Sequence, residues 1–222
     1  MYSIENQYLK IEVSSLGAEL QSIFDKEMKQ EVLWQGDKKY WGRRAPVLFP
    51  NVGRHSGDFY IWKGRKFSTK QHGFARDMNF DCVKEAGEEL VFLLRDTEET
   101  RKYFPFAFEL QISYCLSGRE LEVNWKVKNL GQETMFFTIG GHPAFRVPVL
   151  EGTVQTDYKL LFKEKEELKY RLICPGEGTA DTSRIYKLSL KDYGEYTGCG
   201  IAEHMFDQDA LIFDEGQIQW AA

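Results

Sequence analysis

Two residue types that can hydrogen-bond to a polar ligand stand close together in the segment 71–77. His72 and Arg76 are four residues apart, and Gly73 beside them lets the backbone approach a ligand closely. A guanidinium offers a rigid fork of donors to hydroxyl and ring oxygens, while a neutral imidazole can both donate and accept. The pair therefore suits a neutral polyol. The alternative is a surface loop in which Arg76 pairs with Asp77, since single histidines are more often structural.

His142 lies in a second segment, 138–145, that follows a predicted strand at 135–139. Two glycines and a proline around it end that strand. A histidine where a strand leaves its sheet commonly lines the mouth of a site in a β fold. An imidazole that titrates near neutrality can act there as a general acid. The alternative interpretation is a histidine that caps a turn.

The segment 43–54 is a proline-bracketed loop that carries three guanidiniums, those of Arg43, Arg44 and Arg54. Such a loop could clamp an anionic or hydroxylated ligand. A solvated basic loop beside acidic neighbours is the other interpretation, because exposed ion pairs of this kind are common.

The positions of the histidines and cysteines do not favour metal binding or nucleophilic catalysis. The four histidines share no H-x-x-x-H or Cys/His ligand spacing, so we expect no metal and no cofactor. No G-x-S-x-G motif occurs, and Cys199 is the one cysteine close in sequence to a histidine, His204.

Composition limits the classes of partner. A chain of 222 residues that is 42% apolar and 14% aromatic can bury a full core, which predicts a single domain over 1–222. The net charge of −5, without a basic block longer than two residues, argues against nucleic acid. No apolar run approaches the length of a membrane span, and no secretory leader is evident. Four scattered cysteines favour reduced thiols, so we expect a cytoplasmic protein.

Period-2 alternation predicts the elements that position these residues. It extends over 108–116 and resumes over 121–127 after a Ser-Gly-Arg turn, which predicts an antiparallel hairpin. Shorter pairs at 80–83 with 90–94 and at 59–62 with 66–68 favour a meander. A helix is predicted only over about 97–103, before Pro105. The fold class is therefore all-β, an antiparallel sandwich or barrel with little helix.

Six segments of the sequence together carry a resemblance to a known family: 16–20, 45–53, 72–76, 103–106, 141–145 and 206–213. They resemble the aldose 1-epimerase (galactose mutarotase-like) family, and in particular its LacX-related branch. Their order and spacing agree with that family over nearly the whole chain. The resemblance implies a galactose mutarotase-like supersandwich with an antiparallel β-sandwich fold. It also implies cofactor-free interconversion of the α and β anomers of an aldose, either a hexose or a hexose phosphate.

The resemblance also implies roles for individual residues. His142 matches the family's general acid, and His72 with Arg76 matches its pair of sugar-contacting residues. Arg44 resembles an arginine that precedes the proline loop, and Asp209 is expected to contact sugar hydroxyls. The expected partner is a small-molecule sugar.

One departure from the family concerns the C-terminal region. The family's catalytic glutamate belongs to a late Glu-Pro-Trp motif, and the chain stops at Ala222 before that motif. We expect the last strands of the sandwich to be missing, which would leave sheet edges unpaired and favour a homodimer. The alternative function is a noncatalytic carbohydrate-binding module on the same fold.

Overall fold

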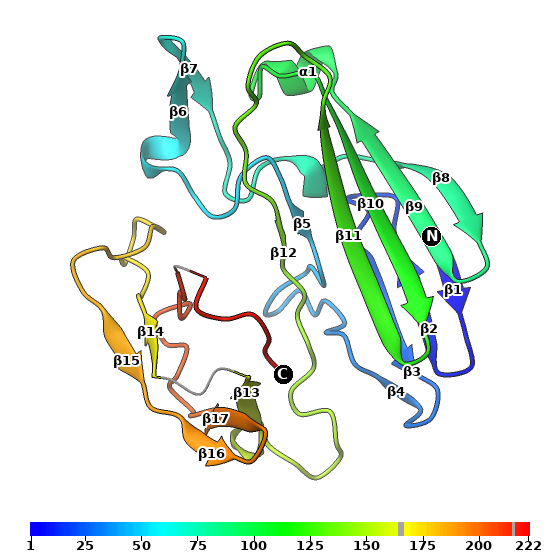
Figure 1. Ribbon diagram of the computed structural model, residues 1–222, viewed down its shortest axis with the longest axis vertical. Coiled ribbons are helices and arrows are strands. Elements are labelled where there is room, and N and C mark those ends of the chain that lie inside the picture. Colours follow the sequence, from blue (N-terminus) through cyan, green and yellow to red (C-terminus); the bar gives the residue numbers. More distant parts are fainter. Residues whose placement is uncertain (164–166, 215) are drawn as a thin grey trace. The chain divides into compact units, whose positions relative to one another are not determined.

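The computed structural model describes residues 1–163, 167–214 and 216–222, and these form two compact units (Figure 1). The first unit is Met1–Arg146 and the second is Val147–Ala222. The single domain expected from the sequence stays a prediction. Within the described ranges, no helix is both long and apolar enough to cross a membrane.

Two antiparallel four-stranded sheets form most of the first unit, in the orders β1-β2-β3-β4 and β11-β10-β9-β8 (Figure 1). Alternating burial along β2 and β10 shows that one face of each sheet meets the core. The strands of the first sheet are β1 (Tyr2–Glu5), β2 (Leu9–Val13), β3 (Leu20–Asp25) and β4 (Gln30–Glu31). Those of the second are β8 (Asp81–Ala86), β9 (Glu89–Arg95), β10 (Phe108–Ser117) and β11 (Glu120–Asn129).

One apolar core joins the two sheets, as a sandwich requires. The ring of Tyr2 in β1 meets the ring of Phe92 in β9 edge-on at 5.4 Å. Tyr114 is fully buried from β10, and its hydroxyl donates to the Ala18 carbonyl at 2.7 Å. Burial raises the pKa of Tyr114, so the phenol stays a neutral donor. Phe49 packs between several aromatic rings in the same core, including Phe108 at 5.1 Å.

The hairpins expected from the alternation are confirmed. β10 and β11 pair along their whole length, with Ser117 opposite Glu120 across a two-residue turn. β8 pairs with β9, and β6 (Phe59–Trp62) pairs with β7 (Arg65–Ser68). The predicted helix is shorter than expected. It is α1 (Glu98–Arg101), and Thr97 caps it by accepting from the Thr100 N–H.

The strand predicted at 135–139 is not regular, and pairing there is confined to a two-residue ladder. β12 (Gly140–Gly141) pairs with β5 (Val47–Leu48). Thr138 N donates to the Pro50 carbonyl at 3.1 Å, but proline has no N–H to return the bond. The ladder therefore stops before it reaches 135–139.

The second unit has a smaller core of its own. Phe162, Leu168, Leu188 and Cys199 are buried together. Two antiparallel sheets supply them, in the orders β13-β17-β16 and β14-β15 (Figure 1). The strands are β13 (Lys159–Phe162), β14 (Leu168–Tyr170), β15 (Tyr186–Leu188), β16 (Lys191–Tyr193) and β17 (Tyr196–Gly200).

Candidate functional site

The extended segment 44–50, which contains β5, lies between the two histidine-bearing segments. On one side Gly141 is opposite Val47, and the His142 N–H donates to the Pro46 carbonyl at 3.0 Å. On the other side Gly73 forms a parallel bridge with Phe49. One short piece of backbone thus sets the positions of residues that are 70 apart in the sequence.

The two predicted imidazoles meet at this place. The rings of His72 and His142 have centroids 5.6 Å apart and an interplanar angle of 50°. The Trp41 indole approaches the His142 ring at 4.9 Å. His142 is exposed, while His72 and Trp41 are half-buried. The pair is therefore accessible to a ligand and has an aromatic wall beside it.

A hydrogen bond sets the tautomer of His72. The Gly53 N–H donates to His72 Nδ1 at 3.0 Å, and the His72 N–H donates to the Gly53 carbonyl at 2.8 Å. Because Nδ1 is the acceptor, the His72 ring in its neutral form carries its proton at Nε2.

Arg76 lies against the backbone that carries His72. Its Nη2 donates to the Gln71 carbonyl at 2.8 Å, and its Nε is buried without a hydrogen bond among the described residues. Burial lowers the pKa of Arg76, and the neighbouring Arg43 guanidinium lowers it further. The Asp77 carboxylate pairs with Arg43, so the expected alternative of an Arg76–Asp77 pair is not the ion pair that forms.

The segment 16–20 anchors both site loops from outside the site. Gly17 N donates to the Met78 carbonyl at 2.7 Å, which holds the loop that follows Arg76. The buried Glu19 accepts at Oε1 from the backbone N–H groups of Arg44 at 2.7 Å and Ala45 at 3.0 Å. Hydrogen bonds from two backbone N–H groups to one carboxylate are stronger than bonds between neutral groups, so they hold the backbone at 44–45 in place. This segment therefore positions the site.

The three arginines of segment 43–54 do not converge into a clamp. Arg44 Nη1 donates to the Gln21 carbonyl at 2.7 Å. Arg54 forms a two-bond pair with Asp58, and Arg43 pairs with Asp77. Each guanidinium has a separate protein partner, as the alternative interpretation of this loop expected. A sugar contact from Arg44 stays a prediction.

Asp209 belongs to the second unit. Its backbone has a φ of 73°, and its N–H donates to the Phe206 carbonyl at 3.0 Å. That places Asp209 in a tight turn whose side chain is exposed. Its expected contact with sugar hydroxyls stays a prediction.

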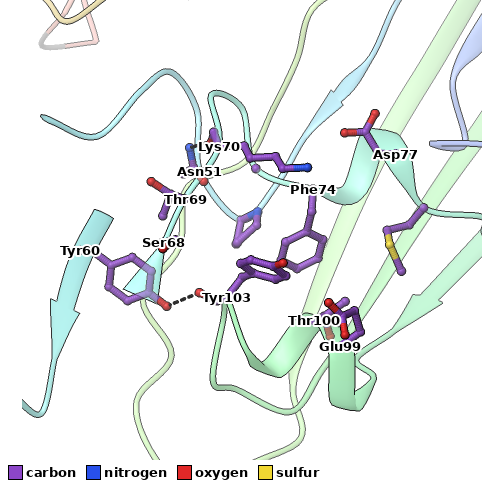
Figure 2. A pocket seen from close by; sticks show the side chains of 13 residues that line it. Asn51, Tyr60, Ser68, Thr69, Lys70, Phe74, Asp77, Glu99, Thr100 and Tyr103 are labelled. Carbon is purple, nitrogen blue, oxygen red and sulfur yellow. Dashed lines mark hydrogen bonds between the residues drawn. The ribbon is translucent and has the colours of Figure 1, made fainter. Parts of the chain in front are cut away.

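Cavities adjoin the histidine segments. His142 borders a cavity of about 160 Å³ together with Trp125 and Pro143. Gly73 and Phe74, which follow His72, border another of about 220 Å³ (Figure 2). At the rim of this second cavity the Tyr60 hydroxyl donates to the Tyr103 carbonyl at 2.9 Å, and burial raises the pKa of Tyr60 to about 12.

Metal binding has no candidate ligand set in the parts of the chain that the structure describes. No group of three or more His, Cys, Asp or Glu side chains lies close enough together to hold an ion.

Sequence reasoning missed three residues that shape the site. Trp41 touches His142, Gly53 sets the His72 tautomer, and Glu19 fixes the loop at 44–45. Trp41 stands just before the arginine-rich loop, so an aromatic residue beside a candidate binding segment was a usable signal. Gly53 and Glu19 lie in segments that carry the family resemblance, but the contacts that they make with distant residues have no local sign in the sequence.

Comparison with known proteins matches a family to most of this chain. The family model described as aldose 1-epimerase matches residues 1–184. The chromosomal LacX protein of Lactococcus lactis subsp. lactis is 35% identical over 184 residues, which is 80% of this chain and 61% of LacX. The chain therefore spans less than two thirds of the length of that relative.

Solved structures are similar to this chain as well. A galactose mutarotase related enzyme from Lactobacillus acidophilus has a TM-score of 0.86 and 36% identity, covering 96% of this chain and 69% of its own. A galactose mutarotase-like protein from Lactobacillus casei has a TM-score of 0.79 and 31% identity, covering 90% and 67%. The galactose mutarotase-like supersandwich expected from the sequence is thus confirmed, because this chain shares the fold of these two structures.

Proposed function

The chain belongs to the aldose 1-epimerase family, and from this premise we propose that it interconverts the α and β anomers of an aldose by acid and base catalysis. The substrate is a hexose or a hexose phosphate. The observation that carries the proposal is the meeting of His72 and His142 at 5.6 Å from segments on either side of 44–50.

Ring opening needs proton transfer at two oxygens of the same sugar. A base removes the proton from the anomeric hydroxyl while an acid protonates the ring oxygen. The bond from the anomeric carbon to the ring oxygen then breaks, and the anomeric carbon becomes a carbonyl. Rotation about the adjacent carbon–carbon bond and the reverse addition give the other anomer. Each transfer contributes on the order of 10²–10⁴-fold.

We assign the acid role to His142 and the positioning roles to His72 and Arg76. His142 is exposed, and an imidazole at this position can give a proton to the ring oxygen. His72 offers Nε2–H as a donor because Nδ1 is occupied by the Gly53 N–H. Arg76 adds guanidinium donors from the same loop, and Arg44 and Asp209 are further candidates for sugar hydroxyl contacts.

A second candidate function is sugar binding without turnover. The 222 residues contain no Glu-Pro-Trp, the motif that carries the catalytic glutamate in the family that the sequence resembles. They also span 61% of the LacX length. This chain by itself would then be a carbohydrate-binding module with the acid and the positioning residues in place.

Exchange NMR separates these two functions. Magnetisation transfer between the anomers of glucose, galactose and their 6-phosphates is measured with and without the protein. The proposal expects exchange faster than in buffer for at least one sugar. Chemical-shift changes of the protein on adding sugar, with exchange no faster than buffer for every sugar, would establish the binding module instead. If the protein neither accelerates exchange nor binds any of these sugars, both functions are rejected.

A further inference from the structure

Among the strands that the structure describes, β11 is at the edge of its sheet, with β10 on one side of it. In an antiparallel pair, alternate residues exchange both backbone hydrogen bonds with the neighbouring strand. The Leu130 N–H continues the β11 register by donating to the Ala107 carbonyl at 2.9 Å. The even-numbered residues of β11 therefore bond to β10. The odd-numbered residues direct their N–H and C=O groups to the outer edge.

The side chains of β11 are sorted by face and by charge. Its odd-numbered residues from 121 to 127 are apolar, and Leu121, Val123 and Val127 pack against the core. Its even-numbered residues between 120 and 128 are all exposed. Along that exposed face, glutamates occupy the first half and lysines the second half, with Asn124 at the midpoint. The four charged residues are Glu120, Glu122, Lys126 and Lys128.

This order makes the strand complementary to itself, and we propose that β11 is an edge through which the chain pairs with a second copy of itself. The two strands run antiparallel about a two-fold axis at Asn124. Glu120 then lies opposite Lys128 of the second copy, and Glu122 lies opposite Lys126. The symmetry repeats both pairs, which gives four oppositely charged contacts on one exposed face.

Backbone geometry agrees with the same register. Val123 lies opposite Trp125 and Leu121 lies opposite Val127 across the axis. These odd-numbered residues carry the outward N–H and C=O groups, so they form the hydrogen-bonded pairs between the two copies. The even-numbered residues then form the pairs that have no hydrogen bonds between the two copies, where opposite side chains approach most closely. The charged pairs thus occupy the sites where cross-strand attraction is strongest. The apolar stripe continues across the axis on the other face.

Other registers are poorer. With the axis at Val123 or at Trp125, only one glutamate of each strand lies opposite a lysine, so two of the four oppositely charged contacts are lost. A shift by one residue would put outward groups of one strand opposite inward groups of the other and would turn the charged face toward the core side. Pairing in the parallel direction places glutamate beside glutamate and lysine beside lysine. One register is therefore selected.

Charge-swap variants test the proposal by sedimentation equilibrium. The wild-type chain is expected to form dimers as its concentration rises. K126E/K128E and E120K/E122K should each weaken self-association by about tenfold or more, because all four attractive contacts become repulsive. An equimolar mixture of the two variants should associate again as a heterodimer, which also shows that both are folded. K187E/K191E reverses the same number of exposed charges in β15 and β16 and is the matched control.

Hydrogen exchange identifies the edge independently of charge. Amide protons of residues 121, 123, 125 and 127 should become protected as the protein concentration rises, while those of 122, 124 and 126 should be protected at every concentration. A chain that is monomeric at all concentrations overturns the proposal. So does a dimer that the charge-swap variants do not weaken, or one in which the odd-numbered amides exchange at a constant rate.

Discussion

His142 is held at its backbone by Pro46 and contacted at its ring by Trp41 and His72. An exposed imidazole with a fixed backbone can be replaced without disturbing the core, so its chemical role can be tested separately from folding. This is the residue on which the proposed reaction depends most.

His142→Ala should lower any acceleration of anomer exchange by about 10²–10⁴-fold, because the proton donor at the ring oxygen is lost. Sugar binding should change little, since many hydroxyl contacts share it. Exchange NMR and a binding titration measure the two effects. His204→Ala removes another exposed histidine, one that pairs with Asp207 at 3.1 Å, and serves as the control. A fully active His142→Ala protein would end the assignment of the acid.

The Glu19 carboxylate stabilises the structure by accepting hydrogen bonds from backbone N–H groups. Glu19→Ala leaves the N–H groups of Arg44 and Ala45 without their acceptor, so the free energy of unfolding should fall by about 2 kcal/mol or more. Glu19→Gln keeps an oxygen acceptor and should lose less. Urea denaturation of the two variants measures the difference, and equal stability of both would show that the Oε1 contacts contribute nothing.

At the scale of elements, the close approach of two chain segments decides where the histidines lie. Gly73 has a φ of +69°, and a Cβ built on it would be 2.2 Å from the Phe49 carbonyl oxygen. Any other residue at position 73 must push the His72 loop away from Phe49 in the segment 44–50. The pairing of the loop with this segment and the position of the His72 ring are thus coupled.

Gly73→Ala should therefore destabilise the protein by about 3 kcal/mol or more and reduce sugar binding. Gly118→Ala is the matched control, because Gly118 also has a positive φ of +57° but its added Cβ meets nothing within 4 Å. The free energy of unfolding of Gly118→Ala should fall only by the cost of the left-handed backbone conformation, about 1 kcal/mol. Thermal denaturation compares the two. Similar losses in both variants would mean that the contact with Phe49 is unimportant.

At the scale of the whole molecule, the four cysteines are spread over both units and none is in a disulfide. Cys199 is buried and the other three are half-buried. Burial raises the pKa of the thiols of Cys82, Cys115 and Cys199, which lowers their thiolate fraction at a given pH.

The native protein should therefore react severalfold more slowly with a disulfide reagent such as DTNB at pH 8 than free cysteine does. The rate should rise as the pH increases toward the raised pKa values, because the thiolate is the nucleophile. In denaturant all four thiols should react quickly. Fewer than four reactive thiols in denaturant would reveal a disulfide and contradict this prediction.

Local patterns were enough to predict the regular elements of the first unit. The alternation over 108–127 determined both the hairpin and its turn, because a half-buried strand must alternate apolar and polar residues. The motif at 72–76 and the histidine at 142 were likewise visible in the sequence. Each carries its chemistry in its own residue types.

Only the tertiary structure decided how these parts meet. Segments near residues 50, 73 and 141 are joined by backbone hydrogen bonds, and backbone groups are the same in every residue. For that reason the sequence indicated two candidate histidines but not the 5.6 Å between them, nor the tautomer that Gly53 imposes on His72. Proline at position 50 ended a ladder that the apolar pattern had extended to 135–139.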